Sequence, residues 1–347
     1  MGDRIDIPTF GHVTLTESIN NMQTVPSFAR QKLFPREITH PTTSVILDII
    51  VGGKKIAPFV KRGNPAKVIS NLGQKTQQVT PPSIRVKKFL TPSDLSLRQA
   101  GNSIFVPGTS GQDSLEAARK AKIANEQKDQ KDVIDRTIEY MCFGALAGSY
   151  SITQDDLQFS IDFGMPSANK PTLSGGAKWD APSTCKPLNN LRTWRGVAHR
   201  ASGKIPTIVM YTTATFEKFL ESADTVKYLD LKKIDLGSVK TDILELEMGA
   251  IKVAEIDGMT HYIYEGSYVD AAGVEKTMIP DGVVILASPT ADNRIHFGLI
   301  EEIQFTMAKY FSKDKVEDDP SGLWLISESD PLPACHQPDS NIYATVF

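Results

Sequence analysis

The chain ends in the stretch Ser327-Glu-Ser-Asp-Pro-Leu-Pro-Ala-Cys-His-Gln-Pro-Asp-Ser-Asn-Ile-Tyr-Ala-Thr-Val-Phe347. Its prolines interrupt regular structure because proline has no backbone N–H to donate, and the chain ends in the largely strand-forming run Ile342-Tyr-Ala-Thr-Val-Phe347. The pattern predicts a short proline-punctuated turn followed by a strand that ends at the last residue. We consider two more stretches together with it, Ile161-Asp-Phe-Gly164 and Leu173-Ser-Gly-Gly-Ala-Lys-Trp179.

The composition is that of an ordinary globular protein. The 347 residues are 40% hydrophobic and 23% charged, with a formal net charge of -3. This balance excludes a wholly disordered chain and a uniformly basic nucleic-acid binder. The length is sufficient for one to three compact units with buried cores. Any argument from charge must therefore be local.

The N-terminus and the cysteines indicate the compartment. Met1-Gly-Asp-Arg-Ile-Asp-Ile-Pro8 has acidic residues and a proline where a secretory signal needs a positive segment and an apolar run. The apolar run 45–51 is interrupted by an aspartate and is far shorter than the roughly 20 residues of a membrane-spanning helix. Cys142, Cys185 and Cys335 are too scattered to suggest a disulfide framework or a zinc site. We expect a soluble protein of a reducing cytoplasm.

The first forty residues contain scattered apolar residues without sustained periodicity. Prolines punctuate this part of the chain at Pro8, Pro26, Pro35 and Pro41. The pattern predicts an extended arm rather than an independent domain, because such a segment has little to bury against itself. A neighbouring surface would then have to order the arm. The alternative is a disordered terminus.

Residues 45–60 and 74–90 have the composition of two strands, and Gly52-Gly53 suits a tight turn with positive φ. The region between 48 and 100 is strongly basic, with only Asp48 and Asp94 as acidic residues. Its basic residues are Lys54, Lys55, Lys61, Arg62, Lys67, Lys75, Arg85, Lys87, Lys88 and Arg98. We predict a basic, protruding hairpin.

The C-terminal region 300–347 has the opposite charge. Its acidic residues include Glu317, Asp318 and Asp319. Opposite charges within one chain can steer the basic loop of one copy onto the acidic surface of another. We therefore predict a contact between subunits through the residues Lys54, Lys55, Arg62, Arg85, Lys87, Lys88, Glu317, Asp318 and Asp319. Two separate solvated faces are the alternative.

Residues 113–147 predict one long helix, because the segment has no proline and no glycine before Gly144. Asp113 and Glu116 have the spacing of a capping box at its start. The second half places an apolar stripe on one face, consisting of Ile134, Ile138, Met141 and Ala145. The first half is nearly all polar. We expect a helix that is buried at one end only.

The remaining sequence predicts a strand over 150–163, a loop over 164–187 and then an α/β unit over 188–299. Within this unit we expect helices at 188–202, 213–222 and 239–248, and strands at 205–211, 251–256, 259–268, 277–278 and 283–288. Gly203 is placed to end the first helix. The unit could be inserted between two halves of a sheet.

No catalytic or cofactor-binding motif is present. Glycine-rich segments at 108–111 and 174–178 lack the order of a phosphate-binding loop, and the six histidines form no metal-binding spacing. Neither a serine-nucleophile elbow nor a dinucleotide fingerprint occurs. We assign no catalytic residue, no metal site and no cofactor.

Several stretches occur in a fixed order along the chain. They are Leu33-Phe-Pro-Arg-Glu37, Ile161-Asp-Phe-Gly164 with Ser174-Gly-Gly-Ala-Lys-Trp179, Tyr268-Val-Asp-Ala-Ala-Gly-Val-Glu-Lys276 with Ile279-Pro-Asp281, and Ser329-Asp-Pro-Leu332 through the terminal strand. Together these stretches resemble the phage major capsid protein E family. Each stretch is unspecific alone. Their joint order and spacing over nearly the whole chain carry the resemblance.

The resemblance implies an α+β fold, the Hong Kong-type capsid fold of tailed phages. The implied parts are an N-terminal arm (1–40), an E-loop hairpin (41–100), a peripheral domain with a spine helix (101–185), an axial domain (186–299), and a return to the peripheral domain with the C-terminal strand (300–347).

The resemblance also implies a function. It is that of a major capsid, or head, protein that assembles as hexamers and pentamers into an icosahedral shell around phage double-stranded DNA. Implied partners are other copies of the chain, a decoration protein, a scaffold, a portal and DNA held without sequence readout, in the host cytoplasm and away from membranes. Noncovalent contacts are implied, although Lys54 or Lys55 could in principle form a crosslink. The alternatives are an encapsulin-type shell with a protein cargo and an α/β enzyme.

Overall fold

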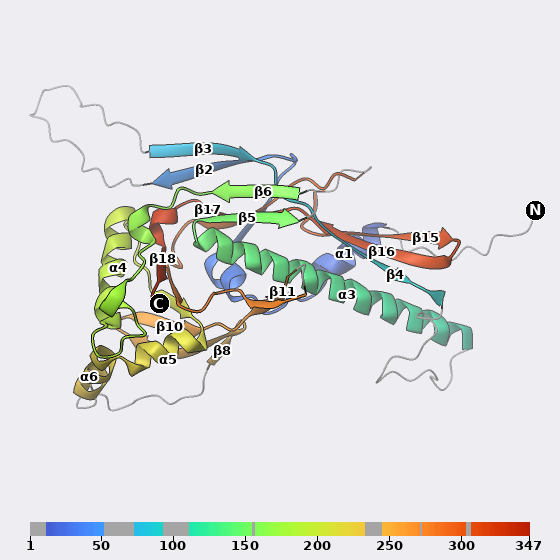
Figure 1. Cartoon of the computed structure of the whole chain (residues 1–347). Helices are drawn as coiled ribbons and strands as arrows, with labels where there is room; N and C mark the ends of the chain where they lie inside the picture. Colours follow the sequence, from blue (N-terminus) through green and yellow to red (C-terminus); the bar gives the residue numbers. More distant parts are fainter. Residues whose placement is uncertain are drawn as a thin grey trace, which may run out of the picture.

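The computed structural model describes residues 12–51, 73–92, 111–154, 157–232, 245–270, 273–302 and 307–347. The chain is built along one long helix, α3 (Gly111–Leu146), which crosses the molecule diagonally in Figure 1. A six-stranded sheet with its helices lies at one end of α3, and a three-stranded sheet lies along the other end (Figure 1). The predicted α+β class is confirmed.

The six-stranded sheet has the order β18-β13-β7-β10-β9-β8. Its strands span Ile342–Thr345, Val283–Ala287, Ile208–Tyr211, Met259–Ile263, Ala250–Ile256 and Glu245–Glu247. The helices beside it are α4 (Pro187–Ser202), α5 (Thr213–Glu221) and α6 (Ala223–Lys232). α4 ends at Gly203, as predicted, because the φ of 81° there suits glycine.

The other sheets are smaller. One has the order β1-β14-β17, formed by Arg36–Thr39, Asn293–Phe297 and Pro331–Cys335, and another has the order β15-β16-β4, formed by Phe311–Asp318, Ser321–Ser329 and Ile84–Leu90. Two-stranded sheets pair β2 (Val45–Val51) with β3 (Gly73–Val79), β5 (Ser149–Gln154) with β6 (Leu157–Asp162), and β11 (Ser267–Val269) with β12 (Glu275–Thr277). The remaining helical segments are α1 (His12–Asn21), η1 (Ala29–Leu33), η2 (Ser167–Asn169), η3 (Gly175–Ala177) and η4 (Pro338–Ser340).

Helix α3 confirms the predicted long helix. The predicted apolar stripe of Ile134, Ile138, Met141 and Ala145 is fully buried. The expectation of an exposed polar half is wrong, however, because Glu126, Gln127, Gln130, Lys131 and Asp135 are buried as well.

Backbone carbonyls from neighbouring segments bond to this polar half. Gln127 Nε2 donates to the carbonyl of Leu15 at 2.6 Å, and Gln130 Nε2 donates to the carbonyl of Leu325 at 2.9 Å. A buried polar group that keeps a hydrogen bond avoids most of the cost of leaving water. One face of this part of the helix is therefore buried, and polar contacts with distant segments occur on that face.

The N-terminal segment differs from the predicted extended arm. Residues 12–21 form helix α1, and residues 29–33 form the π-helical turn η1. The segment packs on its own chain, since Phe28 and Phe34 are fully buried in the main core. Thr16 Oγ1 also donates to the Ser312 carbonyl at 3.1 Å, which ties α1 to β15. The chain's own surface thus orders residues 12–39.

The predicted hairpin is confirmed in part. Strand β2 pairs with β3, but β4 leaves the hairpin and pairs with β16. Pro81-Pro82 lies between β3 and β4, and two residues without N–H groups cannot continue a ladder. The expected turn at Gly52-Gly53 falls outside the described residues, as do Lys54, Lys55 and Arg62.

Two further elements differ from the prediction. The single strand predicted over 150–163 is the antiparallel hairpin β5–β6, because the chain reverses between Gln154 and Leu157. The helix predicted over 239–248 is a strand in its described part, where β8 pairs with β9 through a turn at Met248-Gly249. Both residues of that turn have positive φ, of 53° and 90°, which a helix does not allow.

Sheet membership also departs from the predicted division of the chain at 299/300. Strand β14 lies in the sheet with β1 and β17, whereas the terminal strand β18 pairs with β13 in the six-stranded sheet. The predicted terminal strand therefore exists as β18, and it lies at one edge of the six-stranded sheet. Leu173 N–H donates to Thr345 O and Trp179 N–H to Val346 O, both at 2.9 Å, so the stretch 173–179 runs beside it.

The junction of β4 and β16 has room for glycine alone at position 322. A Cβ atom there would lie 2.2 Å from Phe89 Cζ and 2.9 Å from the Leu90 carbonyl oxygen. We expect Gly322→Ala to lower the free energy of unfolding by about 1–3 kcal/mol, because the strands must separate to admit the methyl group. Urea unfolding of the unassembled subunit measures this change.

Gly196→Ala is the matched control. Gly196 lies inside α4, and its Cβ would meet only the Arg200 side chain at 3.5 Å. Alanine should raise the free energy of unfolding by about 0.5–1 kcal/mol because glycine is a poor helix former. Equal effects of the two substitutions would contradict the packing described for β4 and β16.

Candidate functional site

The predicted contact residues of the described region lie on one sheet. Arg85, Lys87 and Lys88 are on β4, not on the hairpin, while Glu317 and Asp318 end β15. Strand β16 lies between β4 and β15. The structure thus brings the two predicted charge groups into the same three-stranded sheet of one chain.

The basic residues of β4 have partners within the chain. Arg85 bonds to Glu302 Oε1 at 2.6 Å and to Glu328 Oε2 at 2.9 Å. Lys88 bonds to Glu126 of α3, and Lys87 Nζ lies 5.2 Å from the centre of the Trp324 ring.

These cations nevertheless remain accessible, since the side chains of Arg85 and Lys88 are 55% and 49% exposed. Asp318 at the end of β15 and Asp319 in the turn after it are exposed. A role of these residues between subunits stays a prediction.

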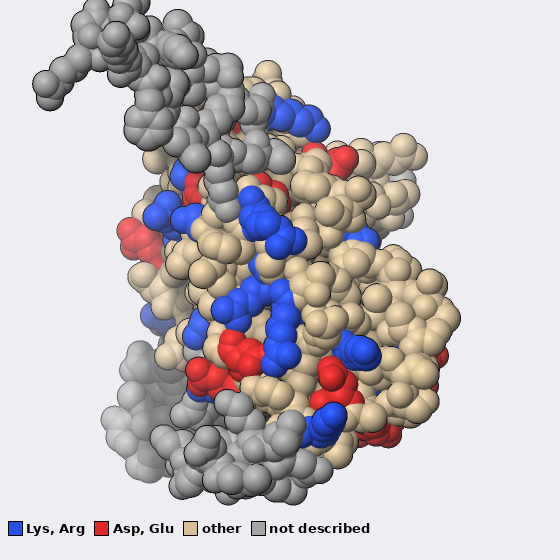
Figure 2. Space-filling view, turned by 90° about the vertical axis from the view of Figure 1, so that its left-hand side faces the viewer, with Lys and Arg blue, Asp and Glu red and all other residues tan. Residues whose placement is uncertain are grey.

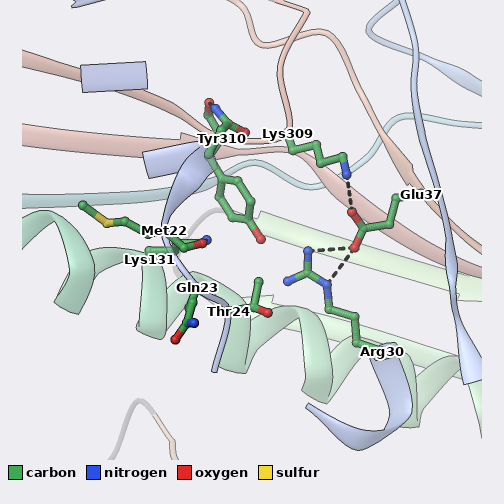
Figure 3. A pocket seen from close by; sticks show the side chains of 9 residues that line it. Met22, Gln23, Thr24, Arg30, Glu37, Lys131, Lys309 and Tyr310 are labelled. Atoms are coloured by element: carbon green, nitrogen blue, oxygen red, sulfur yellow. Dashed lines mark hydrogen bonds and ion pairs between the residues drawn. The ribbon is translucent and has the colours of Figure 1, made fainter. Parts of the chain in front are cut away.

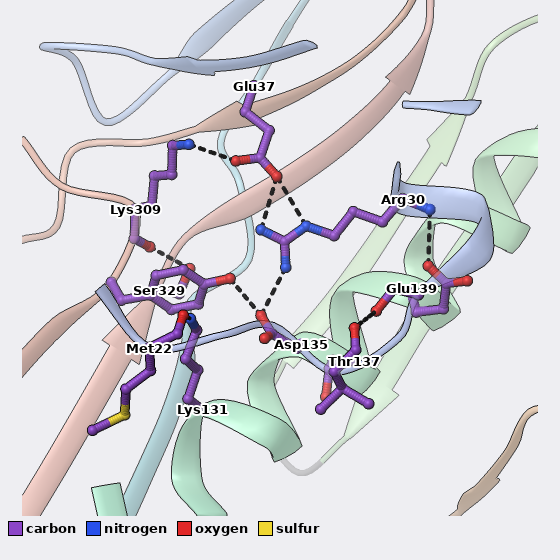
Figure 4. Close-up of polar contacts among 12 residues, drawn as sticks. Met22, Arg30, Glu37, Lys131, Asp135, Thr137, Glu139, Lys309 and Ser329 are labelled. Carbon is purple, nitrogen blue, oxygen red and sulfur yellow. Dashed lines mark hydrogen bonds and ion pairs between the residues drawn. The ribbon is translucent and has the colours of Figure 1, made fainter. Parts of the chain in front are cut away.

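A buried charge cluster joins the N-terminal segment to α3. We call it the arm anchor, and it consists of Arg30, Glu37, Lys131, Asp135, Glu139, Lys309 and Tyr310. Figure 4 shows the Arg30 guanidinium between two carboxylates. Its Nη1 donates to Asp135 Oδ1 at 2.7 Å, and its Nε and Nη2 donate to Glu37 Oε1 at 2.9 and 2.8 Å.

The remaining anchor contacts complete the connection. Lys309 Nζ donates to Glu37 Oε2 at 2.6 Å, and the Tyr310 hydroxyl donates to Asp135. Glu139 accepts the backbone N–H groups of Ala29 and Arg30 at 2.8 and 2.9 Å, at the start of η1. The cluster therefore connects the neighbouring elements η1 and β1 to α3 and to the segment before β15, both of which are distant in sequence.

Burial and pairing shift the titration of the anchor. Burial lowers the pKa of Arg30, but the nearby Tyr310, Glu37 and Asp135 more than compensate and raise it above its ordinary value. Burial raises the pKa of Glu37, yet Arg30 and Lys309 hold it below its ordinary value. Burial raises the pKa of Glu139 to about 7 against the opposing effect of its two N–H donors. The first two groups are therefore charged at neutral pH.

An open pocket of about 370 Å³ lies on one side of the anchor. Figure 3 shows Arg30, Glu37, Lys309 and Tyr310 on its wall, with the chain after α1 opposite them. Lys131 donates to the Met22 carbonyl and lies 5.3 Å from the Tyr310 ring centre. The polar groups of the wall bond mainly to one another, so the pocket is the outer side of a structural cluster.

A basic face was missed by the sequence analysis. Figure 2 shows Lys and Arg side chains gathered in the middle of the face on which α4 lies. Arg192 and Arg200 of α4 are exposed, and α4 contains no acidic residue. Arg192 bonds to Asp257 at 2.6 Å. The near-neutral total charge concealed this face, although the residues 186–204 alone would have revealed it.

The described residues offer little other chemistry. No group of three or more His, Cys, Asp and Glu side chains among them could hold a metal ion, and none of the helices in this part is long and apolar enough to cross a membrane. The three cysteines are free and buried. Burial raises the thiol pKa of each, that of Cys335 to about 12, so the thiolate that reacts is scarce.

Comparison with solved structures identifies the class of fold. A structure from a prophage of Escherichia coli CFT073, described as a capsid protein, matches with a TM-score of 0.75 and 16% identity over 98% of this chain and 99% of that chain. The fold is therefore that of tailed-phage capsid proteins, as the resemblance implied.

The family model for phage major capsid protein E matches residues 11–346, and the chain belongs to this family. Its relatives include the major capsid proteins of Escherichia phage lambda and Enterobacteria phage P21. Each is 25% identical to this chain, over 328 and 334 residues, and each match covers 90% of this chain and 92% of the relative. The family consists of structural proteins, so the enzyme alternative is not supported.

The arm anchor predicts unequal effects of removing its cations. Arg30→Met should lower the free energy of unfolding by about 3–5 kcal/mol, because Asp135 would stay buried with an uncompensated charge. Lys309→Met should cost only about 0–1 kcal/mol, since the Lys309 side chain is 42% exposed and water can replace it. Urea unfolding of the unassembled subunit compares the two. If Arg30→Met lowers the free energy of unfolding by less than Lys309→Met does, the arm anchor described here is wrong.

Proposed function

We propose that this chain is a major capsid protein whose copies form the hexamers and pentamers of an icosahedral phage head. The membership in the phage major capsid protein E family supports a shell-building role. The finer statements about capsomers, partners and the enclosed DNA are our inference.

The hairpin β2–β3 is the observation that carries the proposal. It pairs with no third strand in the described part of the chain. Its inner face is buried through Val45, Leu47 and Ile49, while Ile46 on the outer face is 64% exposed. A two-stranded hairpin with an exposed apolar side chain is marginally stable alone. A second copy that covers it would bury this surface and shield its edges.

We further propose that the head holds double-stranded DNA without reading its sequence and that a scaffold, a portal and a decoration protein take part in assembly in the host cytoplasm. The net charge of -3 argues for containment of DNA rather than tight binding. An encapsulin-type shell with a protein cargo is the alternative. The contents of purified particles, DNA or protein, distinguish the two.

Expression of the chain alone and with a candidate scaffold tests the proposal. Negative-stain electron microscopy and sedimentation should show closed shells, or hexamers and pentamers. A stable monomer in both conditions would contradict a shell-building role. On denaturing gels of particles we expect single chains, because we propose noncovalent assembly.

Substitution of Arg85 or Lys88 would remove bonds within the chain as well as the predicted charge contact between copies. The test therefore uses three of the other predicted residues, in the triple substitution Lys54→Glu, Lys55→Glu and Arg62→Glu. We expect assembly at roughly 50 mM salt to slow by about tenfold, and much less at roughly 500 mM, because salt screens steering. Light scattering follows the rate.

A charge swap provides the control. Combining the triple substitution with Glu317→Lys, Asp318→Lys and Asp319→Lys should restore most of the rate, since attraction between copies returns with exchanged signs. If neither the rate nor its salt dependence changes in the first variant, the predicted contact does not exist.

A further inference from the structure

Three histidines form a hydrogen-bonded row that ends on the hairpin. His40 follows β1, His296 lies on β14 and His336 follows β17. His40 Nε2 lies 2.8 Å from His296 Nδ1, and His296 Nε2 lies 3.0 Å from His336 Nε2. His336 Nδ1 lies 2.7 Å from the backbone carbonyl oxygen of Asp48 on β2.

The carbonyl at the end of the row fixes every proton in it. A carbonyl only accepts, so His336 Nδ1 carries the hydrogen, and a neutral His336 then accepts at Nε2. His296 must donate from Nε2 and accept at Nδ1, and His40 must donate from Nε2. The geometry therefore requires neutral His296 and His336 rings with one defined tautomer each, and a hydrogen on Nε2 of His40.

His336 holds β2 in the way a third strand would. Its own carbonyl accepts the N–H of Ile50 at 2.9 Å, and its ring donates to the carbonyl of Asp48 two residues earlier. The N–H of His336 donates to the Asp292 carbonyl at 3.0 Å, which fixes the residue to the segment before β14. The root of the hairpin is therefore attached to the body through His336.

The hydrogen bonds of the row disfavour a second proton on the rings of His296 and His336. A proton on His296 Nδ1 or on His336 Nε2 would set one N–H against another, whereas Nδ1 of the half-buried His40 is not used by the row. Burial and the neighbouring histidines lower the pKa of His296 to about 3, and burial lowers the pKa of His40.

Charged groups surround the row from each packed element. Asp292 favours a charge on His296, while Arg294 on β14 opposes it. Arg36 on β1 lies 3.5 Å from Asp292 and offsets that carboxylate. On the hairpin side the Asp48 carboxylate accepts the Thr76 hydroxyl across the strands at 2.8 Å.

We propose that His40, His296 and His336 form a latch that attaches the root of the β2–β3 hairpin at neutral pH and releases it on acidification. The attached state takes up fewer protons than the released state, because the hydrogen bonds of the row use both nitrogens of the His296 ring, whereas a histidine ring in water takes up a proton near its ordinary pKa of about 6.5. Attachment is therefore strongest above that pH and weakens as the pH falls toward the lowered pKa of His296. For each proton that is taken up on release, the equilibrium constant for release increases about tenfold when the pH falls by one unit.

Nuclear magnetic resonance of the full-length, unassembled subunit labelled with ¹⁵N-histidine tests the row directly. At pH 7.5 we expect His336 protonated at Nδ1, and His40 and His296 protonated at Nε2, with all three rings neutral. A charged His296, or a hydrogen on Nε2 of His336, would overturn the proposal. This measurement requires no substituted protein and does not depend on shell assembly.

Amide hydrogen exchange of β2 and β3, corrected for intrinsic rates between about pH 7.5 and 5, tests the release. Hairpin opening should increase below about pH 6.5 with a slope of at least one proton. His296→Gln keeps one donor and one acceptor but does not titrate, so the slope should fall by about one. The slope counts protons, so a uniform loss of stability would not mimic this change.

His261→Gln is the matched control. His261 is also buried and lies 2.7 Å from the Tyr211 hydroxyl, but it belongs to β10 in the six-stranded sheet. Burial lowers the pKa of His261 to about 4, so this ring also resists protonation, but it lies in a different sheet from the hairpin. The wild-type slope should persist in this variant. A hairpin whose opening does not change with pH, or an unchanged slope in His296→Gln, would refute the latch.

Discussion

The burial of charge on α3 is the constraint on which the rest of the structure depends. The Asp135 side chain is fully buried, and a carboxylate in that position needs a cation and hydrogen-bond donors close by. Arg30 supplies the cation from 105 positions earlier in the chain, and Tyr310 supplies a hydroxyl. The N-terminal segment and the strand pair β15–β16 are thereby joined to one point of the helix.

Strand β1 transmits this connection to the hairpin. Glu37 on β1 bonds to Arg30 and Lys309, and three residues later His40 begins the row that ends on β2. Strand β14 lies between β1 and β17 and contributes the central histidine. Two polar systems, one of ion pairs and one of neutral rings, thus flank the same short sheet. The N-terminal segment is attached to the rest of the chain by ion pairs, and the hairpin β2–β3 is attached to it by hydrogen bonds of the histidine row.

Short sequence patterns predicted those helices and strands whose limits depend on neighbouring residues alone. The length of α3, the end of α4 at Gly203 and the terminal strand follow from missing prolines, a glycine C-cap and strand-forming residues. The double proline before β4 was overlooked as a strand breaker, and the positive φ at Met248 has no signal in sequence. The polar half of α3 did carry a signal: Gln127, Lys131, Asp135 and Glu139 recur every fourth residue and continue the buried face. Their partners are distant in sequence, so no local rule identifies them.

A protein whose copies assemble needs some sheet edges that can bind another copy and others that are protected from such binding. The strand β15 and the hairpin β2–β3 differ in this respect. Strand β15 is an edge, yet Thr16 and Asn20 of α1 occupy its first part through the carbonyls of Ser312 and Tyr310. Its outer part, from Lys313 to Asp318, is charged at every position except Val316, which disfavours pairing with another strand. The hairpin β2–β3 instead presents the exposed apolar Ile46, and no third strand pairs with it in the described part of the chain. This difference between the two strand pairs is the reason that we propose the hairpin, and not β15, as the site where another copy binds.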